Sequence, residues 1–148
     1  MLKFLNRNKN SKVIDSSVFI DGRIIGIIES GFMEGNLIIP QFVLEEMQTM
    51  ADSKDHDKRQ KGRKGLDVAF KVQKLANAKV LDKEVEANTV DMKLVILSKE
   101  INAKLLALDV NLNKVAKVHL IPVLNINDLY NAIKPRLVVG QTISIKIK

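Results

Sequence analysis

The sequence predicts an α/β fold in which a central parallel sheet lies between two layers of helices, a three-layer α/β/α sandwich. Short apolar runs alternate with segments of helical spacing along most of the chain. Strands that alternate with helices are typical of parallel pairing, because each helix returns the chain across the sheet. A chain of 148 residues with 46% hydrophobic content is long enough for one compact domain and too short for two ordinary ones.

Two strands and three helices are predicted in the first half of the chain. The strands are apolar runs bounded by polar or turn-forming residues, and the helices have apolar residues spaced by three and four. Gly31 is the expected end of the first helix, and Pro40 suits the first turn of the second. The predicted strands are 13–14 and 37–39, and the predicted helices are 18–29, 40–51 and 66–75.

Three strands and three helices follow in the second half, with the same alternation. Thr89 can cap the first of these helices with its hydroxyl. The predicted strands are 80–81, 104–108 and 120–124, and the predicted helices are 90–102, 112–118 and 126–133. Together these elements form a predicted domain over residues 12–134.

The last residues follow a different pattern. Lys134-Pro135 interrupts the alternation, and isoleucines then alternate with polar residues over 142–148. This period of two is typical of a half-buried antiparallel strand. Residues 135–148 are therefore predicted to be a linker and the first strand of a further domain, and the chain is predicted to be a segment of a longer protein.

The composition narrows the chemistry of any site. Lysine and arginine number 24 against 17 acids, a formal charge of +7, which favours a polyanionic partner, although a merely basic surface is the alternative. The absence of cysteine excludes disulfides, zinc-thiolate sites and thiol catalysis. His56 lies in a charged stretch and His119 at a predicted helix end, so a metal ion would have to be held by carboxylates.

Two acids are expected at the edge of the sheet where ligands bind in open α/β folds. Asp15 follows the first predicted strand, and Asp109 ends the strand that begins at Lys104. The functional crevice of such sheets lies at the carboxyl ends of the strands. Each aspartate could instead simply cap the helix that follows it.

A third acid comes from the predicted helix over 40–51. At about 100° per residue, Glu46 lies roughly 65° from the apolar stripe of this helix and Glu45 roughly 165° from it. Glu46 is therefore expected to face inward, where it needs either a cation or a buried salt bridge to offset its desolvation.

A fourth acid, Asp91, falls in the first turn of the helix after Thr89, where the helix dipole favours an acid whatever its function. The four acids could nevertheless converge on one crevice. Carboxylates that share a site repel one another, so such a cluster favours a bound Mg²⁺ or Mn²⁺ ion.

Five blocks of sequence, in this order, resemble the PIN domain of PIN and TRAM proteins of the YacL-like kind. The resemblance extends from about Lys12 to Lys134. The blocks are Val13 to Ile24, Ile39 to Gln48, Gly62 to Asp67, Val90 to Leu94 and Asp109 to Ala116.

This resemblance implies a nuclease related to the flap-nuclease group, which binds Mg²⁺ or Mn²⁺ and hydrolyses phosphodiesters in single-stranded or structured RNA. The family's metal-binding acids fall on the four acids already named, and its auxiliary polar positions fall on Ser17 and Asn113. The family usually has threonine or serine two residues before its last aspartate, where this chain has Ala107.

The resemblance also implies partners and a location. A small RNA-binding TRAM barrel often follows the PIN domain, membrane helices commonly precede it, and PIN domains are often homodimers. The domain itself is expected to be cytoplasmic, with membrane contact only through segments outside this chain, since no run here approaches the roughly 18 apolar residues of a membrane span.

A basic stretch over 54–64 is expected to be a loop between two helices. Beside an acidic pocket it could hold the phosphate backbone of RNA, and a solvated loop is the alternative. The predicted RNA-binding residues are Lys58, Arg59, Lys61, Arg63 and Lys64. The phenylalanines are expected mostly in the core, so stacking platforms for bases are not predicted.

Three functions are compatible with these residues. The leading hypothesis is a metal-dependent endoribonuclease, and the second is a non-catalytic RNA-binding or assembly module with the same fold. The third is a receiver or phosphohydrolase that uses Asp15 as phospho-acceptor. The haloacid-type pattern, however, needs a second aspartate two residues later, where Ser17 stands.

Overall fold

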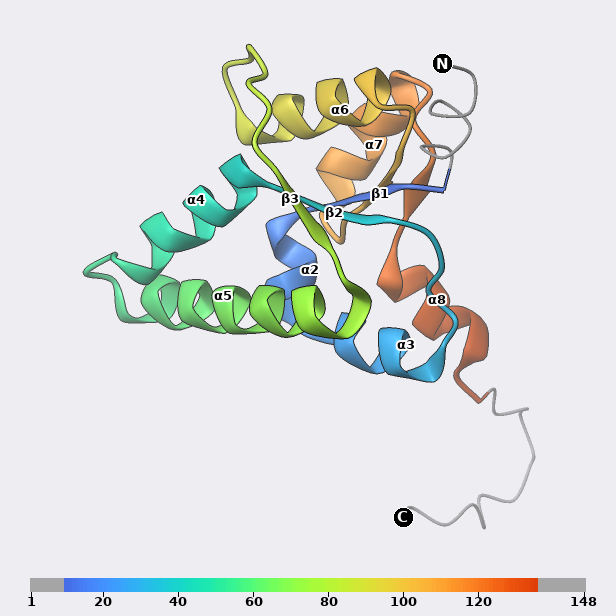
Figure 1. Ribbon diagram of the computed structural model, residues 1–148, viewed down its shortest axis with the longest axis horizontal. Helices are drawn as coiled ribbons and strands as arrows, with labels where there is room; N and C mark the ends of the chain where they lie inside the picture. Colours follow the sequence, from blue (N-terminus) through green and yellow to red (C-terminus); the bar gives the residue numbers. More distant parts are fainter. Residues whose placement is uncertain (1–9, 136–148) are drawn as a thin grey trace, which may run out of the picture.

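A five-stranded parallel sheet forms the centre of the computed structural model, which describes residues 10–135 (Figure 1). The strand order is β3-β2-β1-β4-β5. β1 lies in the middle, where Val13 pairs with Ile38 on one side and with Leu105 on the other. The strands are β1 (Lys12–Ile14), β2 (Leu37–Pro40), β3 (Lys79–Leu81), β4 (Lys104–Leu106) and β5 (Val123–Leu124).

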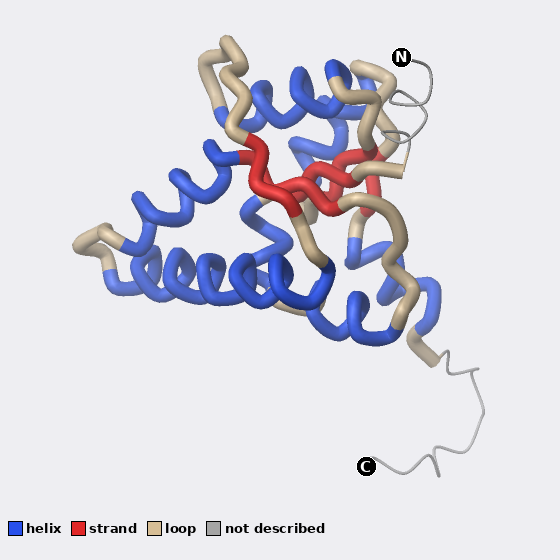
Figure 2. The backbone as a smooth tube through the Cα atoms, viewed as in Figure 1, coloured by secondary structure: helices blue, strands red, loops and turns tan. Residues whose placement is uncertain are grey.

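Helices cover both faces of this sheet. In Figures 1 and 2, α6 and α7 lie on one side of the strands, and α2, α3 and α5 lie on the other. The helices of the described chain are α2 (Ser16–Asp21), α3 (Ile24–Ser30), α4 (Gln41–Ala51), α5 (His56–Ala76), α6 (Val90–Glu100), α7 (Val110–Val118) and α8 (Ile126–Ile133). The predicted three-layer sandwich with a parallel sheet is confirmed.

The strands are apolar because both faces of the sheet are covered. Val13 and Ile14 are neighbours in β1, so they point to opposite faces, and both are fully buried. Leu105 and Leu106 do the same in β4. The core therefore has two halves, one under each layer of helices.

Side-chain caps set the start of most helices. Asp15, Asp55, Thr89, Asp109 and Asn125 each accept a hydrogen bond from a backbone N–H in the first turn of the helix that follows. These bonds satisfy donors that a helix leaves free at its first turn. Three of these caps, Asp15, Asp109 and Asn125, come within three residues of the end of a strand, so strand, cap and helix form one unit.

The predicted single helix over 18–29 is wrong. Gly22 adopts a left-handed conformation with φ +87°, and its N–H donates to the carbonyl of Val18 at 3.1 Å. This C-cap ends α2, and α3 begins separately at Ile24. The predicted end at Gly31 is confirmed, with φ +86°.

The predicted loop over 54–64 is also wrong. α5 begins at His56, ten residues before the predicted start, because Asp55 caps it by accepting from the N–H of Lys58 at 3.0 Å. Lysine, arginine and glutamine are good helix formers even without an apolar pattern. The basic residues therefore stand on a helix.

Smaller differences occur at strand and helix ends. α6 ends at Glu100, and β4 ends at Leu106, both two residues before the predicted ends. Leu120 has φ +62°, which is incompatible with the predicted strand over 120–124, and only Val123–Leu124 pairs. The strand predicted over 142–148 lies outside the described residues. Within residues 10–135, no helix has both the length and the apolar character needed to cross a bilayer.

Candidate functional site

Four adjacent strands each lead to one of the predicted acids. Asp15 directly follows β1, and Asp109 follows β4 by three residues. Glu46 lies on α4, which follows β2, and Asp91 lies in the first turn of α6, which follows β3 by a loop. Since β3, β2, β1 and β4 are parallel neighbours, their carboxyl ends share one edge of the sheet.

Asp15 is the most buried of these acids, with 6% of its surface exposed. Its Oδ2 accepts from the backbone N–H of Ser17 at 3.3 Å and from the Ser17 hydroxyl at 2.7 Å. The same hydroxyl oxygen accepts from the N–H of Leu108 at 3.1 Å. Ser17 therefore ties Asp15 to the segment that follows β4, and it fixes the carboxylate relative to the neighbouring strand.

Burial raises the pKa of Asp15, because the ionised form loses hydration. Hydrogen bonds from Ser17 and from the N–H of Ser16 lower this pKa, and the negative charge of Asp91 raises it. The net pKa lies above the ordinary value. Asp15 is thus a carboxylate whose ionised form needs positive charge nearby.

Glu46 faces inward, as its helical position predicts. Its side chain is half-buried whereas that of Glu45 is exposed. Oε1 of Glu46 is buried and has no hydrogen-bond partner in the described part of the chain. Burial raises the pKa of Glu46, and the negative charges of Asp15 and Asp91 raise it further, while a hydrogen bond from Ser16 opposes them. An unpartnered buried carboxylate oxygen is uncommon in stable folds and has the chemistry of a cation ligand.

Asp91 and Asp109 are more exposed than the other two acids, and the charge of Asp109 acts on Asp91. Burial raises the pKa of Asp91, and the negative charge of Asp109 adds to this effect. Oδ1 of Asp109 accepts from the N–H groups of Asn111 at 2.8 Å and Leu112 at 3.4 Å. Asp15 and Asp109 therefore both cap helices, as the alternative interpretation held. Capping uses Oδ1 of Asp109, and Oδ2 accepts no hydrogen bond from residues 10–135.

Asn113 lies against the end of β4. Its Nδ2 donates to the carbonyl of Ala107 at 3.4 Å, and its buried Oδ1 has no partner among the described residues. Ala107 is fully buried and supplies no hydroxyl. Asn113 therefore carries a second buried oxygen, close to the strand end, whose hydrogen-bonding capacity is unused.

The acids are coupled by charge but do not form a closed coordination shell. Charge effects connect Glu46 with Asp15, Asp15 with Asp91, and Asp91 with Asp109. In the part of the chain that the structure describes, however, no three aspartate, glutamate or histidine side chains are close enough to hold one metal ion. The carboxylates are therefore near enough to shift one another's pKa values but too far apart for three of them to bind the same ion. The all-oxygen donor set fits Mg²⁺ or Mn²⁺ in kind, and the side chains would have to converge to bind one.

The predicted RNA-binding residues occupy the first turns of α5, and two of them have structural contacts. Lys64 Nζ donates to the carbonyl of Asp21 at 3.2 Å, at the end of α2. A guanidinium nitrogen of Arg59 lies 3.4 Å from the carbonyls of Ser53 and Lys54. The remaining three, Lys58, Lys61 and Arg63, are exposed.

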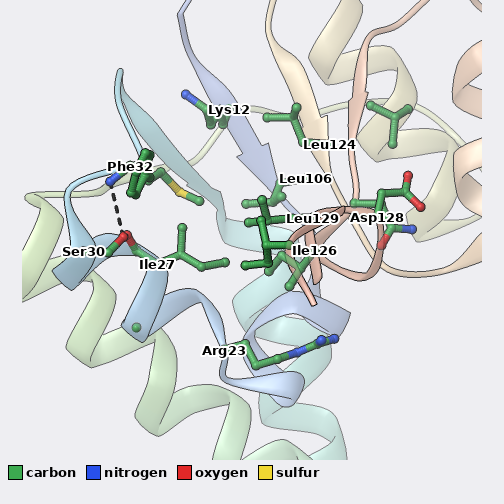
Figure 3. A pocket seen from close by; sticks show the side chains of 15 residues that line it. Lys12, Arg23, Ile27, Ser30, Phe32, Leu106, Leu124, Ile126, Asp128 and Leu129 are labelled. Carbon is green, nitrogen blue, oxygen red and sulfur yellow. Dashed lines mark hydrogen bonds between the residues drawn. The ribbon is translucent and has the colours of Figure 1, made fainter. Parts of the chain in front are cut away.

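A large cavity lies elsewhere. An apolar groove of about 870 Å³ runs between α3 and α8, and Ile27, Leu106 and Leu129 contribute to its walls (Figure 3). Arg23 and Asp128 are polar residues of its lining. None of the four predicted acids borders this groove. Hydrolysis of a charged phosphodiester requires polar groups, so we place the candidate site at the acidic edge and not in this groove.

Two features of the structure were not predicted. Ser16, buried directly after Asp15, lowers the pKa of Glu46, and only its position beside the first acid could have indicated this. The expectation that phenylalanines lie mostly in the core holds for two of the four that the structure describes, since Phe19 is buried and Phe42 packs against the core. Phe32, however, is 87% exposed, and Phe70 is 57% exposed. Phe70 stands one position from the buried Ala69 on α5, where helical periodicity places it outward.

Comparisons with known proteins agree with this architecture. No family model matches the chain. The chain is 45% identical to the uncharacterized PIN and TRAM-domain containing protein YacL of Bacillus subtilis, over 95% of this chain and 39% of that protein. It is 42% identical to the uncharacterized PIN and TRAM-domain containing protein slr1972 of Synechocystis, over 92% of this chain and 39% of that protein. The chain thus spans about two fifths of the length of the relatives it matches.

Solved structures share the fold at lower sequence identity. A domain of a functionally unknown protein from Methanocaldococcus jannaschii aligns with a TM-score of 0.66 and 23% identity, over 93% of this chain and 99% of that one. The PIN domain of human SMG5 aligns with a TM-score of 0.51 and 14% identity, over 84% of this chain and 99% of that one. The sequence relatives and this common fold together show that the chain has the PIN fold and is similar to the YacL-like PIN and TRAM-domain proteins over about two fifths of their length.

Proposed function

We propose that this domain is a nuclease that depends on a divalent metal ion and hydrolyses phosphodiester bonds in RNA. The observation that carries the proposal is the placement of four acids after adjacent parallel strands whose carboxyl ends share one edge of the sheet, with Glu46 Oε1 buried and unpartnered among the described residues. Homology to PIN-domain proteins supports it, because this fold is that of a nuclease family. The basic charge of the chain favours a nucleic-acid substrate.

In the proposed site, Asp15, Glu46, Asp91 and Asp109 hold Mg²⁺ or Mn²⁺. A bound divalent ion supplies a water of lowered pKa and stabilises negative charge on the leaving oxygen. Ser17 is an auxiliary residue that fixes the Asp15 carboxylate through its hydroxyl, and Asn113 offers an unpartnered amide oxygen near the end of β4. The buried acids repel one another until positive charge arrives, which favours ion binding over an empty site.

A second candidate is a non-catalytic RNA-binding or assembly module that retains the fold. Two observations favour it: the hydroxyl expected at position 107 is missing because Ala107 stands there, and no three acids in residues 10–135 lie within shared coordination distance. Under this hypothesis Asp15 and Asp109 are retained as helix caps. RNA is the partner in both cases.

The wider protein is also a matter of proposal. We place the PIN domain over 12–134 and assign 135–148 to a linker and the first strand of a TRAM domain, which the names of the relatives support. From the same family resemblance, we propose that the domain is cytoplasmic and forms a homodimer. Any anchoring to a membrane would come from other segments of the protein.

The substitution Asp109→Asn separates the two candidates. Asparagine caps a helix about as well as aspartate, so the bonds to Asn111 and Leu112 should persist. It lacks the negative charge that a divalent ion requires. We expect the variant to keep the wild-type melting temperature without metal, to lose stabilisation by Mn²⁺, and to lose cleavage of single-stranded RNA, measured on a labelled oligonucleotide.

Asp55→Asn is the matched control, because Asp55 caps α5 in the same manner and does not belong to the acidic edge. This control should cleave as the wild type does. Cleavage by Asp109→Asn at the wild-type rate would assign the activity to a contaminant or another site. A wild-type protein that binds RNA and cleaves none in Mn²⁺ would establish the non-catalytic module instead.

A further inference from the structure

The outer face of α5 carries a line of basic residues around one exposed aromatic ring. At about 100° per residue, Arg63, Phe70 and Lys74 lie within roughly 40° of one another on the helix surface, and Lys71 lies roughly 80° from Arg63. All four are exposed. The core-facing residues of the helix, which include Val68, Ala69 and Val72, point away from this face. We call Arg63, Phe70, Lys71 and Lys74 the outer face of α5.

Phe70 has no role in the core that explains its size. The side chain is 57% exposed, although the buried positions beside it are filled by small or β-branched residues. Lys74 Nζ lies 4.8 Å from the centre of the Phe70 ring, a cation–π arrangement. The exposed ring therefore has a cation over one of its faces, and single-strand-binding proteins combine aromatic rings and cations to hold a base and its phosphate.

The cations on this face form no ion pair with any of the described residues. Among residues 10–135 the only ion pair joins Arg23 and Asp21, so Arg63, Lys71 and Lys74 take part in none. Asp67 is the one acid on the same side of α5, against three cations. A surface with surplus positive charge and no internal partner is complementary to a polyanion.

We infer that the outer face of α5 binds single-stranded RNA, with Phe70 stacking on a base and Arg63, Lys71 and Lys74 contacting the phosphate backbone. This inference rests on the proposed function and gives the nuclease a surface for its substrate outside the acidic edge. An anionic membrane is the other polyanion to consider. It is less suited, because a bilayer requires a broad apolar face and Asp67 lies in the middle of this one.

α5, which carries this surface, is next to the helix that carries Glu46. α5 packs directly on α4, and a Cβ on Gly62 would lie 2.6 Å from the carbonyl oxygen of Met47. α4 carries Glu46, one residue before Met47. RNA held along α5 would therefore lie on the helix that packs against α4, and the residues Phe70, Lys71 and Lys74 lie in its last turns, which lead into the start of β3.

The test measures binding of a 20-nucleotide oligouridylate by fluorescence anisotropy in a chelator, so that cleavage plays no part. Loss of one stacking platform should weaken binding at least about fivefold in Phe70→Leu, and Phe70→Tyr should restore it. Phe32→Leu is the matched control, because Phe32 is also a highly exposed phenylalanine and lies in the loop between α3 and β2. Its affinity should equal that of the wild type.

Salt dependence tests the cations separately. The double substitution Lys71→Gln and Lys74→Gln should lower the slope of log affinity against log salt by about 0.7 for each lost contact to a single strand. Lys99→Gln is the control, since Lys99 is an exposed lysine of α6, on the other side of the sheet (Figure 1). The same variants are tested with vesicles of phosphatidylserine and phosphatidylcholine.

The outcomes are distinguishable from those of the nuclease proposal. Wild-type affinity in Phe70→Leu and an unchanged salt slope in the lysine variant would overturn this surface, even if cleavage depended on Asp109. Vesicle binding that depends on Phe70 without oligouridylate binding would overturn it in favour of a membrane. Binding that depends on α5 in a protein that never cleaves would support this surface and overturn only the nuclease proposal.

Discussion

At the residue scale, one serine hydroxyl connects two strand ends. Ser17 donates to Asp15 and accepts from the N–H of Leu108, so it joins the segment after β1 to the segment after β4. A hydroxyl can do both because it carries one donor and two acceptor lone pairs. The relative position of the first and last acids of the proposed site depends on this bridge.

We therefore expect Ser17→Ala to lower the free energy of unfolding by about 1–3 kcal/mol, because the N–H of Leu108 and the Asp15 carboxylate each lose a partner. Urea denaturation measures the loss. Ser30→Ala serves as control, since the Ser30 hydroxyl donates to Ile27 on an exposed surface where water can replace it. Equal losses in the two variants would contradict the bridging role.

A second residue-scale prediction concerns the unpartnered oxygen of Glu46. Glu46→Gln removes a charge that burial and Asp15 both disfavour, so in a chelator at pH 7 the variant should be more stable than the wild type. It should also gain less stability from Mn²⁺. Thermal melts with and without the ion measure both effects.

Glu45→Gln is the neighbouring control, because Glu45 is exposed. It should match the wild type in both melts. A Glu46→Gln variant that Mn²⁺ stabilises as much as the wild type would remove Glu46 from the set of metal ligands.

Helical periodicity was sufficient to choose between the two glutamates, because the direction of a side chain on a helix follows from its position alone. The same reasoning could not predict that Lys64 contacts Asp21. That contact joins residues 43 positions apart and depends on how α2 packs on α5. Residues whose role is set by their own element were thus predictable, and residues whose role is set by a neighbouring element were not.

At the element scale, α4 and α5 approach each other unusually closely. A Cβ on Gly62 would lie 2.3 Å from the backbone nitrogen of Ala51 and 2.6 Å from the carbonyl oxygen of Met47. Both neighbours are backbone atoms of α4, which cannot move as a flexible side chain can. Gly62 therefore sets the distance between the basic helix and the helix that carries Glu46.

Gly62→Ala should destabilise the domain by roughly 1–3 kcal/mol, because the two helices must separate to accept the methyl group. Gly26→Ala in α3 is the control, since a Cβ there meets nothing within 4 Å. In an open helical position alanine is favoured over glycine by up to about 1 kcal/mol, so this control should be neutral or stabilising. Denaturant midpoints compare the two. A neutral Gly62→Ala would show that the close approach is not required.

The elements that the sequence predicted well have both a periodic pattern and clear end signals. The helix over 126–133 has the observed bounds, and Thr89 caps α6 as predicted. The prediction missed the first part of α5 because its charged residues show no apolar periodicity. This part of the helix depends on the helix propensity of its residues and on the cap at Asp55. The prediction also missed the break at Gly22, because a glycine inside a helical pattern can either continue or end the helix, and only its φ angle decides which.

At the scale of the whole molecule, strand order determines which acids meet. Alternation of strands and helices predicted a parallel sheet, and hence one edge for all carboxyl ends, but it left the order of the strands open. In the structure, β1 lies between β2 and β4. This order places the strands that precede the four acids side by side. The distances among the carboxylates depend on loops and side-chain rotamers, which no sequence pattern specifies.

The crowding of acids predicts an unusual dependence of stability on pH. Burial raises the pKa values of Asp15, Glu46 and Asp91 above their ordinary values, and mutual repulsion adds to the effect. The folded protein then binds more protons than the unfolded chain, so the free energy of unfolding falls as pH rises from the ordinary values through the raised ones. In a chelator, the stability of the wild type relative to Asp15→Asn should therefore decrease as pH rises from about 4 toward neutrality.

Asp21 provides the opposite sign within the same protein. Burial alone would raise its pKa, but hydrogen bonds and positive charge from Arg23, with a contribution from Lys64, outweigh burial and lower it. Stability of the wild type relative to Asp21→Asn should therefore increase as pH rises, since a depressed pKa stabilises the fold above it. Urea titrations across the pH range measure both differences. Because Mn²⁺ binds the ionised acids, it should reverse the decline for Asp15 and leave the trend for Asp21 unchanged. Parallel trends for the two variants, with or without Mn²⁺, would mean that the acidic edge carries no special charge, and the case for a metal site there would fail.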